Sequence, residues 1–201
     1  MFIVIALTLV GAAVAVVASL LHDGLSARAT PNRFEVKVAR SVRHFAIPAS
    51  AQATPNPVLA SAEDLRDARI HFADHCAICH GNDGAGKTMM GEGLFPKPPD
   101  LRLPETQNLT DGELFWIIEN GVRFTGMPGF SNGGEHGGMQ DSWKLVHFIR
   151  HLPHLTAAEH IEMERYNPKG PEDRAEEQQE NDFLNGATPQ RKPEEQNRRR
   201  E

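Results

Sequence analysis

The side chains of this chain that are best suited to bind a cofactor lie in one short segment, Cys76-Ala-Ile-Cys-His80. The two cysteines are the only ones in the 201-residue sequence. Side chains three and four residues apart share one face of a helix, so Cys76, Cys79 and His80 are predicted to project together. This C-x-x-C-H spacing is the attachment signature of a c-type haem. Two thiols add to the two haem vinyl groups, and the adjacent imidazole reaches the iron.

Other uses of a C-x-x-C pair fit the sequence less well. A zinc site needs two further Cys or His ligands at suitable spacing, and the sequence holds no second cysteine pair. A thioredoxin-like redox motif needs a βαβ setting, and no strand-rich pattern surrounds residues 76–80. A chance match is the third alternative. The sequence favours covalent haem over all three.

The best candidate for a second axial ligand is Met127, in the segment Gly126-Met-Pro-Gly129. Pro128 restricts the residue before it to extended geometry, and the flanking glycines permit close backbone approach. A thioether opposite an imidazole favours reduced iron and raises the reduction potential. The competing interpretation is a gap-filling core methionine. The other candidate ligands are the nine remaining histidines and Met89, Met90, Met139 and Met163.

Four segments occur in an order that resembles class I c-type cytochromes. They are Cys76–Gly86, Gly93–Leu101, Thr110–Gly121 and Gly126–Gly129. The resemblance covers roughly residues 58–165 and is nearest to the bacterial monohaem domain found in cbb3-type oxidase subunits and cytochrome-linked dehydrogenases. It implies an all-α fold around one covalent haem c, attached through Cys76 and Cys79. It also implies that His80 and Met127 are the axial iron ligands.

The same resemblance implies two further residues at the haem. The Pro99 carbonyl would accept the proximal His80 N–H, and Leu101 would pack on the ring. The chain departs from the family where Ser131–Gly138 intervenes before the last helix. This Gly-rich stretch predicts a flexible loop near the haem edge.

The hydrophobic pattern independently predicts helices and shows no convincing β alternation. Four helix starts are expected from capping residues: Ser61 with Asp64, Thr110 with Glu113, Asp141, and Thr156 with Glu159. Gly121 is the expected end of the second helix, and Pro153 the expected end of the third.

An uncharged segment, Phe2–Leu21, begins the chain. Twenty helical residues span about 30 Å, the thickness of a bilayer hydrocarbon core. We expect residues 1–21 to be a single transmembrane helix; the alternative is a cleaved secretory signal, which normally begins with basic residues. The resemblance implies haem attachment outside the cytoplasm, so the expected location is a bacterial inner membrane with the haem domain facing the periplasm. The cations that follow conflict with the positive-inside tendency, but long domains translocate despite local charge.

Two further regions flank the expected cytochrome domain. In the region 22–57, Phe34, Val38, Val42 and Phe45 recur at helical spacing among basic residues, followed by a Pro/Ala-rich linker. This pattern is typical of an amphipathic helix on anionic headgroups or, equally, of a solvated linker helix. The charged tail 166–201 is predicted to be disordered. A docking segment with Asp182-Phe-Leu184 as its apolar anchor is the alternative.

Charge is divided unevenly along the chain. Residues 58–165 carry a net charge of −7, residues 22–57 carry +3, and the tail carries −2. An acidic haem domain favours redox partners with a basic patch and disfavours nucleic acid.

These features predict a membrane-tethered monohaem cytochrome c that passes single electrons between membrane or periplasmic redox proteins, and not an enzyme. The first alternative is an obligate electron-transfer subunit of a larger dehydrogenase or terminal oxidase. The second is a haem-based gas sensor, which requires an open sixth iron site and is disfavoured by Met127.

Overall fold

The computed structural model describes residues 2–22, 26–131 and 138–186. Across these residues every regular element is a helix and no strand occurs, which confirms the expected all-α class. The elements before the Cys-x-x-Cys-His segment are α1 (Phe2–His22), α2 (Arg33–Ala46), α3 (Ala49–Gln52), α4 (Ala62–His71) and the π-turn η1 (Phe72–Cys76). Those from that segment onward are α5 (Ala77–His80), α6 (Met89–Glu92), α7 (Pro104–Gln107), α8 (Asp111–Asn120), α9 (Gly138–His151), the 3₁₀ turn η2 (Leu152–His154), α10 (Ala157–Glu164) and α11 (Pro171–Leu184).

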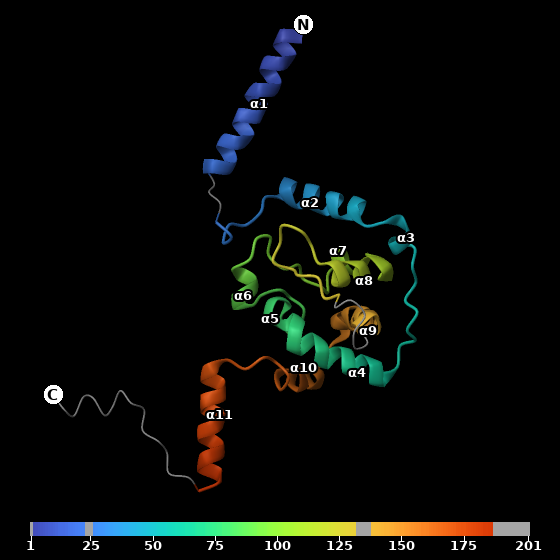
Figure 1. The fold of residues 1–201 in the computed structure, drawn as a ribbon, viewed down its shortest axis with the longest axis vertical. Helices are drawn as coiled ribbons and strands as arrows, with labels where there is room; N and C mark the ends of the chain where they lie inside the picture. Colours follow the sequence, from blue (N-terminus) through green and yellow to red (C-terminus); the bar gives the residue numbers. More distant parts are fainter. Residues whose placement is uncertain (1, 23–25, 132–137, 187–201) are drawn as a thin grey trace, which may run out of the picture. The chain divides into compact units, whose positions relative to one another are not determined.

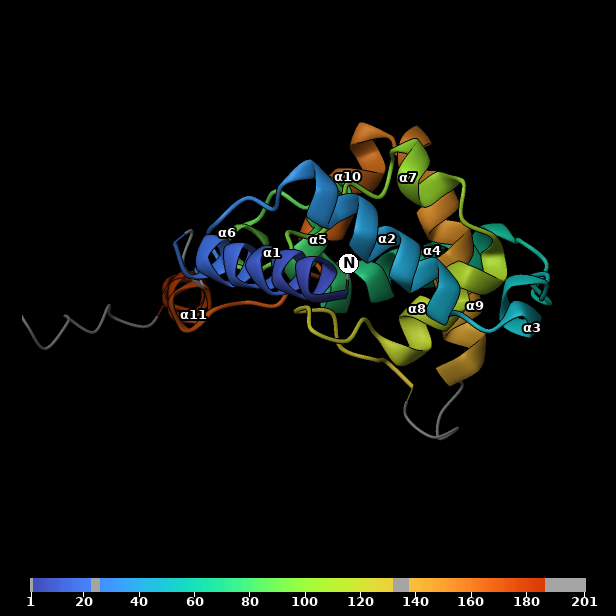
Figure 2. The same cartoon turned by 90° about the horizontal axis from the view of Figure 1, so that it is seen from above.

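The core forms where α4 and α8 both pack against α9 (Figures 1 and 2). The buried Phe72 and Phe148 rings meet at a centroid distance of 5.1 Å, which joins η1 to α9. Phe115 of α8 stacks on Trp143 of α9 at 4.0 Å. Large aromatic side chains bury the most apolar surface per residue, so these pairs join the elements before and after residues 76–80 into one core.

Capping chemistry fixes the starts of the predicted helices. The Ser61 hydroxyl accepts the Asp64 N–H at 3.0 Å and begins α4. Thr110 with Glu113, and Thr156 with Glu159, form complete capping boxes at α8 and α10. Gly121 ends α8 with a positive φ of 66°, which glycine adopts without steric cost. These four expectations are confirmed.

Three local features differ from the sequence prediction. Helix α9 begins at Gly138, so Asp141 lies inside its first turn and is not its N-cap; a carboxylate there still stabilises the helix N-terminus. The helix ends at His151, and Pro153 falls in η2, where its missing N–H costs little. The π-turn η1 interrupts the helix that carries Cys76. Residues 132–137 of the expected flexible loop lie outside the described residues.

The N-terminal segment is helical over Phe2–His22, and its described side chains, residues 2–18, are exposed. Over the part of the chain that the structure describes, no helix is long and apolar enough to cross a membrane.

The chain divides after Tyr166 into two units, and the structure describes residues 167–186 of the second. These residues contain the helix α11, which the sequence analysis did not predict. Pro171 at the first helical position is pre-organised for a helix, the Asp173 carboxylate accepts the Gly170 N–H at 2.8 Å, and Lys169 pairs with Glu177. Local capping and ion pairing therefore favour a helix that buries no side chain of its own.

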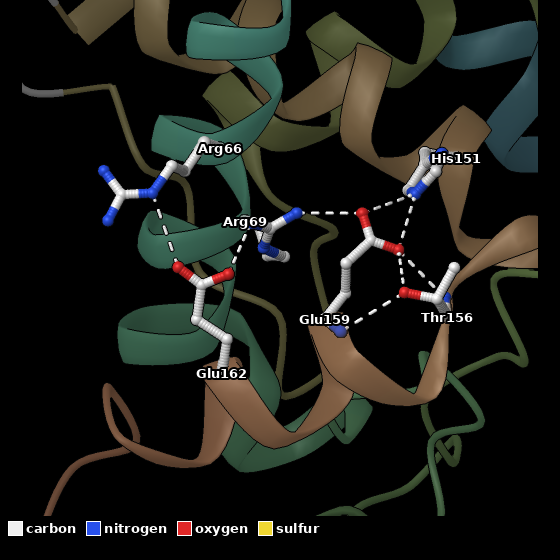
Figure 3. Close-up of polar contacts among 6 residues, drawn as sticks. All are labelled: Arg66, Arg69, His151, Thr156, Glu159 and Glu162. Atoms are coloured by element: carbon white, nitrogen blue, oxygen red, sulfur yellow. Dashed lines mark hydrogen bonds and ion pairs between the residues drawn. The ribbon is translucent and has the colours of Figure 1, made fainter.

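An ion-pair network joins α10 to α4, the helix that leads into the Cys-x-x-Cys-His segment (Figure 3). The Arg69 side chain, 11% exposed, reaches Glu159 at 2.8 Å and Glu162 at 2.6 Å. Burial acts to raise the pKa of Glu159, but hydrogen bonds from Thr156 and His151 outweigh it and bring the pKa to about 2. Glu159 is therefore charged at every physiological pH and keeps Arg69 paired.

We expect Arg69→Ala to destabilise the protein by about 2 kcal/mol, because two partly buried carboxylates lose a charged hydrogen-bond donor. Arg66→Ala is the matched control: Arg66 is 57% exposed and meets Glu162 only at 3.4 Å, so its loss should cost about 0.5 kcal/mol or less. Urea unfolding of the haem-loaded variants, followed by far-ultraviolet circular dichroism, measures both. Equal midpoints for the two variants would contradict the assigned role of the network.

Candidate haem site

The two cysteines lie at the junction of η1 and α5. Cys76 ends the π-turn, and Cys79 and His80 lie in α5. Phe72, Ala73 and Ala77 bury the inner side of this segment, which leaves both cysteines only partly buried. A π-turn inserts one residue into a helix and re-aims the side chains that follow it. The segment is therefore anchored on the core by its apolar residues, and Cys76 itself packs against that core.

Both thiols are free, and Cys79 affects the pKa of Cys76. Burial raises the pKa of Cys76 to about 12, with a further contribution from the neighbouring Cys79. Burial also raises the pKa of Cys79. The pair is thus protonated at neutral pH. Within the described ranges, no set of three or more His, Cys, Asp or Glu side chains converges as a metal ion would need, so the zinc alternative has no ligand set among them.

His80 presents a neutral imidazole next to these thiols. Its ring lies 6.5 Å from that of Phe72, measured between centroids. Burial lowers the pKa of His80, and the Pro99 backbone acts in the opposite direction. The Pro99 backbone is therefore near the ring. The buried Nδ1 of His80 nevertheless has no hydrogen-bond partner among the described residues. The hydrogen bond between Pro99 and His80 that the resemblance implies thus stays a prediction.

A glycine-rich loop holds Pro99 in this place. The Gly86 N–H donates to the His80 carbonyl at 2.7 Å, and the Leu101 N–H donates to the Gly84 carbonyl at 2.8 Å. Gly86 has a φ of +73°, and a Cβ on it would lie 2.5 Å from the Pro98 carbonyl oxygen. Only glycine allows this approach. Leu101 is 7% exposed and belongs to the core.

The start of helix α6 packs against the backbone carbonyl groups of Ile78 and Cys79. The Thr88 hydroxyl lies 2.7 Å from the Ile78 carbonyl and also accepts the Gly91 N–H at 2.8 Å. A Cβ on Gly91 would lie 2.6 Å from the Cys79 carbonyl oxygen. Thr88 and Gly91 are positioning residues that the sequence analysis missed. In the sequence, the one sign of this arrangement is Thr88 as a candidate N-cap residue, a weak signal for so short a helix.

The Met127 loop folds back on the end of α8. The Val122 N–H donates to the Met127 carbonyl at 3.1 Å, and the Met127 N–H donates to the Thr125 hydroxyl at 3.1 Å. Met127 itself is half-buried. A Cβ on Gly126 would lie 2.6 Å from the Leu94 side chain, and the Leu94 N–H donates to the Gly91 carbonyl at 3.1 Å. Leu94 and α6 therefore link the Met127 loop to Cys79.

The other candidate methionines have different environments. Met163 is fully buried in the core. Met89 is 95% exposed and Met139 is 62% exposed. Met90, on α6, is 49% exposed. Met127 differs from these four because it lies in a loop between α8 and α9, whereas the others lie in the helices α6, α9 and α10.

Comparison with known families assigns a class to this arrangement. Residues 63–149 match the family model described as cytochrome C oxidase, cbb3-type, subunit III. These residues form a class I c-type cytochrome domain of the cbb3 type. No curated protein matches the chain.

The residues present fit the covalent haem c that this class implies. Two free thiols lie in the same segment as a neutral imidazole, whose Nδ1 is buried without a hydrogen-bond partner and whose pKa burial lowers and the Pro99 backbone acts to raise. A ring nitrogen that donates to a carbonyl leaves the other nitrogen free for a metal and fixes the tautomer. Cys76 and Cys79 would hold the porphyrin, and haem c supplies a one-electron couple when bound.

Gly121 tests the geometry of the Met127 loop. Its φ is +66°, and a Cβ there would lie 2.5 Å from the Gly129 nitrogen and 2.7 Å from the Met127 carbonyl oxygen. We expect Gly121→Ala to destabilise the protein by about 2 kcal/mol and to change the near-infrared absorption of the oxidised, haem-loaded protein.

Gly93→Ala is the matched control, because its Cβ would meet nothing closer than 3.3 Å and its φ is not positive. Thermal unfolding and near-infrared absorption of both variants measure the difference. The loop assignment is wrong if Gly121→Ala behaves like Gly93→Ala in both measurements.

Proposed function

We propose that this chain is a membrane-tethered monohaem cytochrome c that passes single electrons between redox partners, with His80 and Met127 as its axial ligands. The observation that carries the proposal is the neutral His80 ring, which lies 6.5 Å from the Phe72 ring and near the Pro99 backbone, in one segment with two free thiols. The cytochrome class supports electron transfer in general.

Each residue has a defined task in this proposal. Cys76 and Cys79 hold the cofactor covalently, so it stays with the chain in both oxidation states. Pro99 orients His80, and Met127, whose loop is linked to Cys79 through Leu94 and α6, would supply the second axial ligand. A His/Met ligand pair raises the reduction potential, and a rigid shell favours fast transfer. No substrate is transformed, so the chain acts as a carrier.

The acidic charge of residues 58–165, −7 in total, favours encounter with basic partner surfaces. Such steering weakens as ionic strength rises, because salt screens exposed charges. The proposed partners are redox proteins of the membrane or periplasm, and not nucleic acid.

Support for membrane attachment comes from the sequence of residues 2–21, which holds no charged side chain. The proposed location is a bacterial inner membrane, with the cytochrome domain on the periplasmic side. A tether raises the effective concentration of the domain near membrane partners.

A second candidate function is that of an obligate subunit of a larger oxidoreductase. The description of the matching family, an oxidase subunit, favours it. In that case α11 and the residues around it would contact other subunits. Purification with stoichiometric partners supports this candidate, and a monomer that purifies alone supports the free carrier.

We expect Met127→Ala to lose the Met–iron charge-transfer band, to bind CO readily when reduced, and to lower the reduction potential by on the order of 0.2 V. Met139→Ala is the control, since Met139 is 62% exposed, and should leave all three properties unchanged. Near-infrared spectra, CO difference spectra and redox titration measure them. Rapid CO binding by the unmodified reduced protein at neutral pH would favour the gas-sensor alternative and contradict the carrier proposal.

We expect the full-length protein to remain in the membrane pellet after alkaline carbonate extraction, and a chain lacking residues 2–21, exported by a cleavable signal, to be released into the soluble fraction. Haem absorbance in pellet and supernatant gives the distribution. Release of the full-length protein by carbonate would contradict membrane tethering and leave the electron-carrier assignment unaffected.

A further inference from the structure

One side of α2 is attached to the cytochrome domain. His44 Nδ1 lies 2.8 Å from a carboxylate oxygen of the buried Glu113, and Arg40 lies 3.7 Å from Glu105. Ile47, which follows the helix directly, is only 2% exposed. The Gln52 side chain donates to the His44 carbonyl at 3.1 Å and to the Ile47 carbonyl at 2.9 Å. These contacts connect α2 to the starts of α7 and α8.

The opposite side of α2 is apolar and uncovered. Phe34, Val38, Val42 and Phe45 follow one another at helical spacing and are 75%, 43%, 62% and 91% exposed. We call these four residues the α2 stripe. Arg43 is half-buried on the other side, where burial lowers its pKa. Exposed phenylalanines in a row are costly in water and mark an interaction surface.

Charge and chain order indicate what covers the stripe. Helix α2 carries Arg33, Lys37, Arg40 and Arg43 against the single acid Glu35, whereas residues 58–165 are strongly acidic. Arg40 and Arg43 lie on the side attached to the cytochrome domain, so Arg33 and Lys37 are the cations that would meet a lipid surface. A basic helix with an apolar stripe is typical of one that lies in the headgroup layer of an anionic bilayer. Only residues 23–32 separate it in sequence from the uncharged helix α1, so both segments would meet the same surface.

We propose that α2 lies flat in the headgroup layer of an anionic membrane, with the α2 stripe toward the acyl chains and Glu113 and Glu105 held on its other side. The helix then gives the cytochrome domain one orientation relative to the bilayer, whereas α1 alone would set only its distance. This inference rests on the membrane attachment proposed above.

Hydrogen–deuterium exchange of the full-length, haem-loaded protein tests the proposal. The protein is reconstituted in vesicles of phosphatidylcholine with roughly a third phosphatidylglycerol, and in phosphatidylcholine alone. We expect amides of residues 33–46 to exchange about tenfold more slowly in the anionic vesicles. Phe34→Ser/Phe45→Ser should abolish that protection. Both side chains are exposed, so the haem spectrum and thermal unfolding should not change.

The matched control is Phe183→Ser/Leu184→Ser, which removes two apolar side chains that are 70% and 72% exposed on α11. It should leave the protection of residues 33–46 intact. Equal exchange in both vesicle types, or protection that persists in Phe34→Ser/Phe45→Ser, overturns the proposal. So does protection that appears only when a redox partner protein is added, because the stripe would then be a protein interface.

An alkaline wash of the vesicles separates the proposal for α2 from the proposal of membrane attachment. A chain that stays with the vesicles through an alkaline wash while residues 33–46 exchange freely contradicts the α2 proposal alone. A chain that does not stay with the vesicles at all contradicts both.

Discussion

The imidazole of His80 must be buried, uncharged and aimed in one direction, and much of the domain is arranged around that requirement. The Phe72 ring lies 6.5 Å from it, the Pro99 backbone lies near it, and the His80 carbonyl accepts the Gly86 N–H at 2.7 Å. Burial keeps the ring neutral by lowering its pKa, and a neutral imidazole is the form that binds a metal. Moving any of these neighbours would reorient the ring.

The surrounding helices hold the segments on which His80, the two cysteines and Met127 lie. The π-turn η1 places Phe72 in the core and ends at Cys76, and both cysteines are partly buried. Helix α6 and Leu94 then connect Cys79 to the Met127 loop through close contacts at Gly91 and Gly126. At those two positions even a methyl group would collide with a neighbour, so the loops on either side of the site hold each other in place.

Much of this arrangement was predictable because its determinants are local. Ser61, Thr110 and Thr156 begin helices through their own side chains, and Gly121 ends one through its backbone freedom. The π-turn, the start of α9 before Asp141 and the attachment of α2 to Glu113 depend on residues distant in sequence, so periodicity alone could not predict them. Helix α11 was missed because low apolar content was interpreted as disorder, whereas capping and ion pairing suffice for a helix.

The central claim is that Cys76 and Cys79 hold one haem covalently beside His80. Mass spectrometry of the denatured, intact protein after expression with a c-type haem maturation system tests it most directly. The account predicts a mass above that of the polypeptide by one haem, with the added mass on the peptide that contains residues 76–80. A protein that carries haem when folded, yet gives the bare polypeptide mass when denatured, would contradict it.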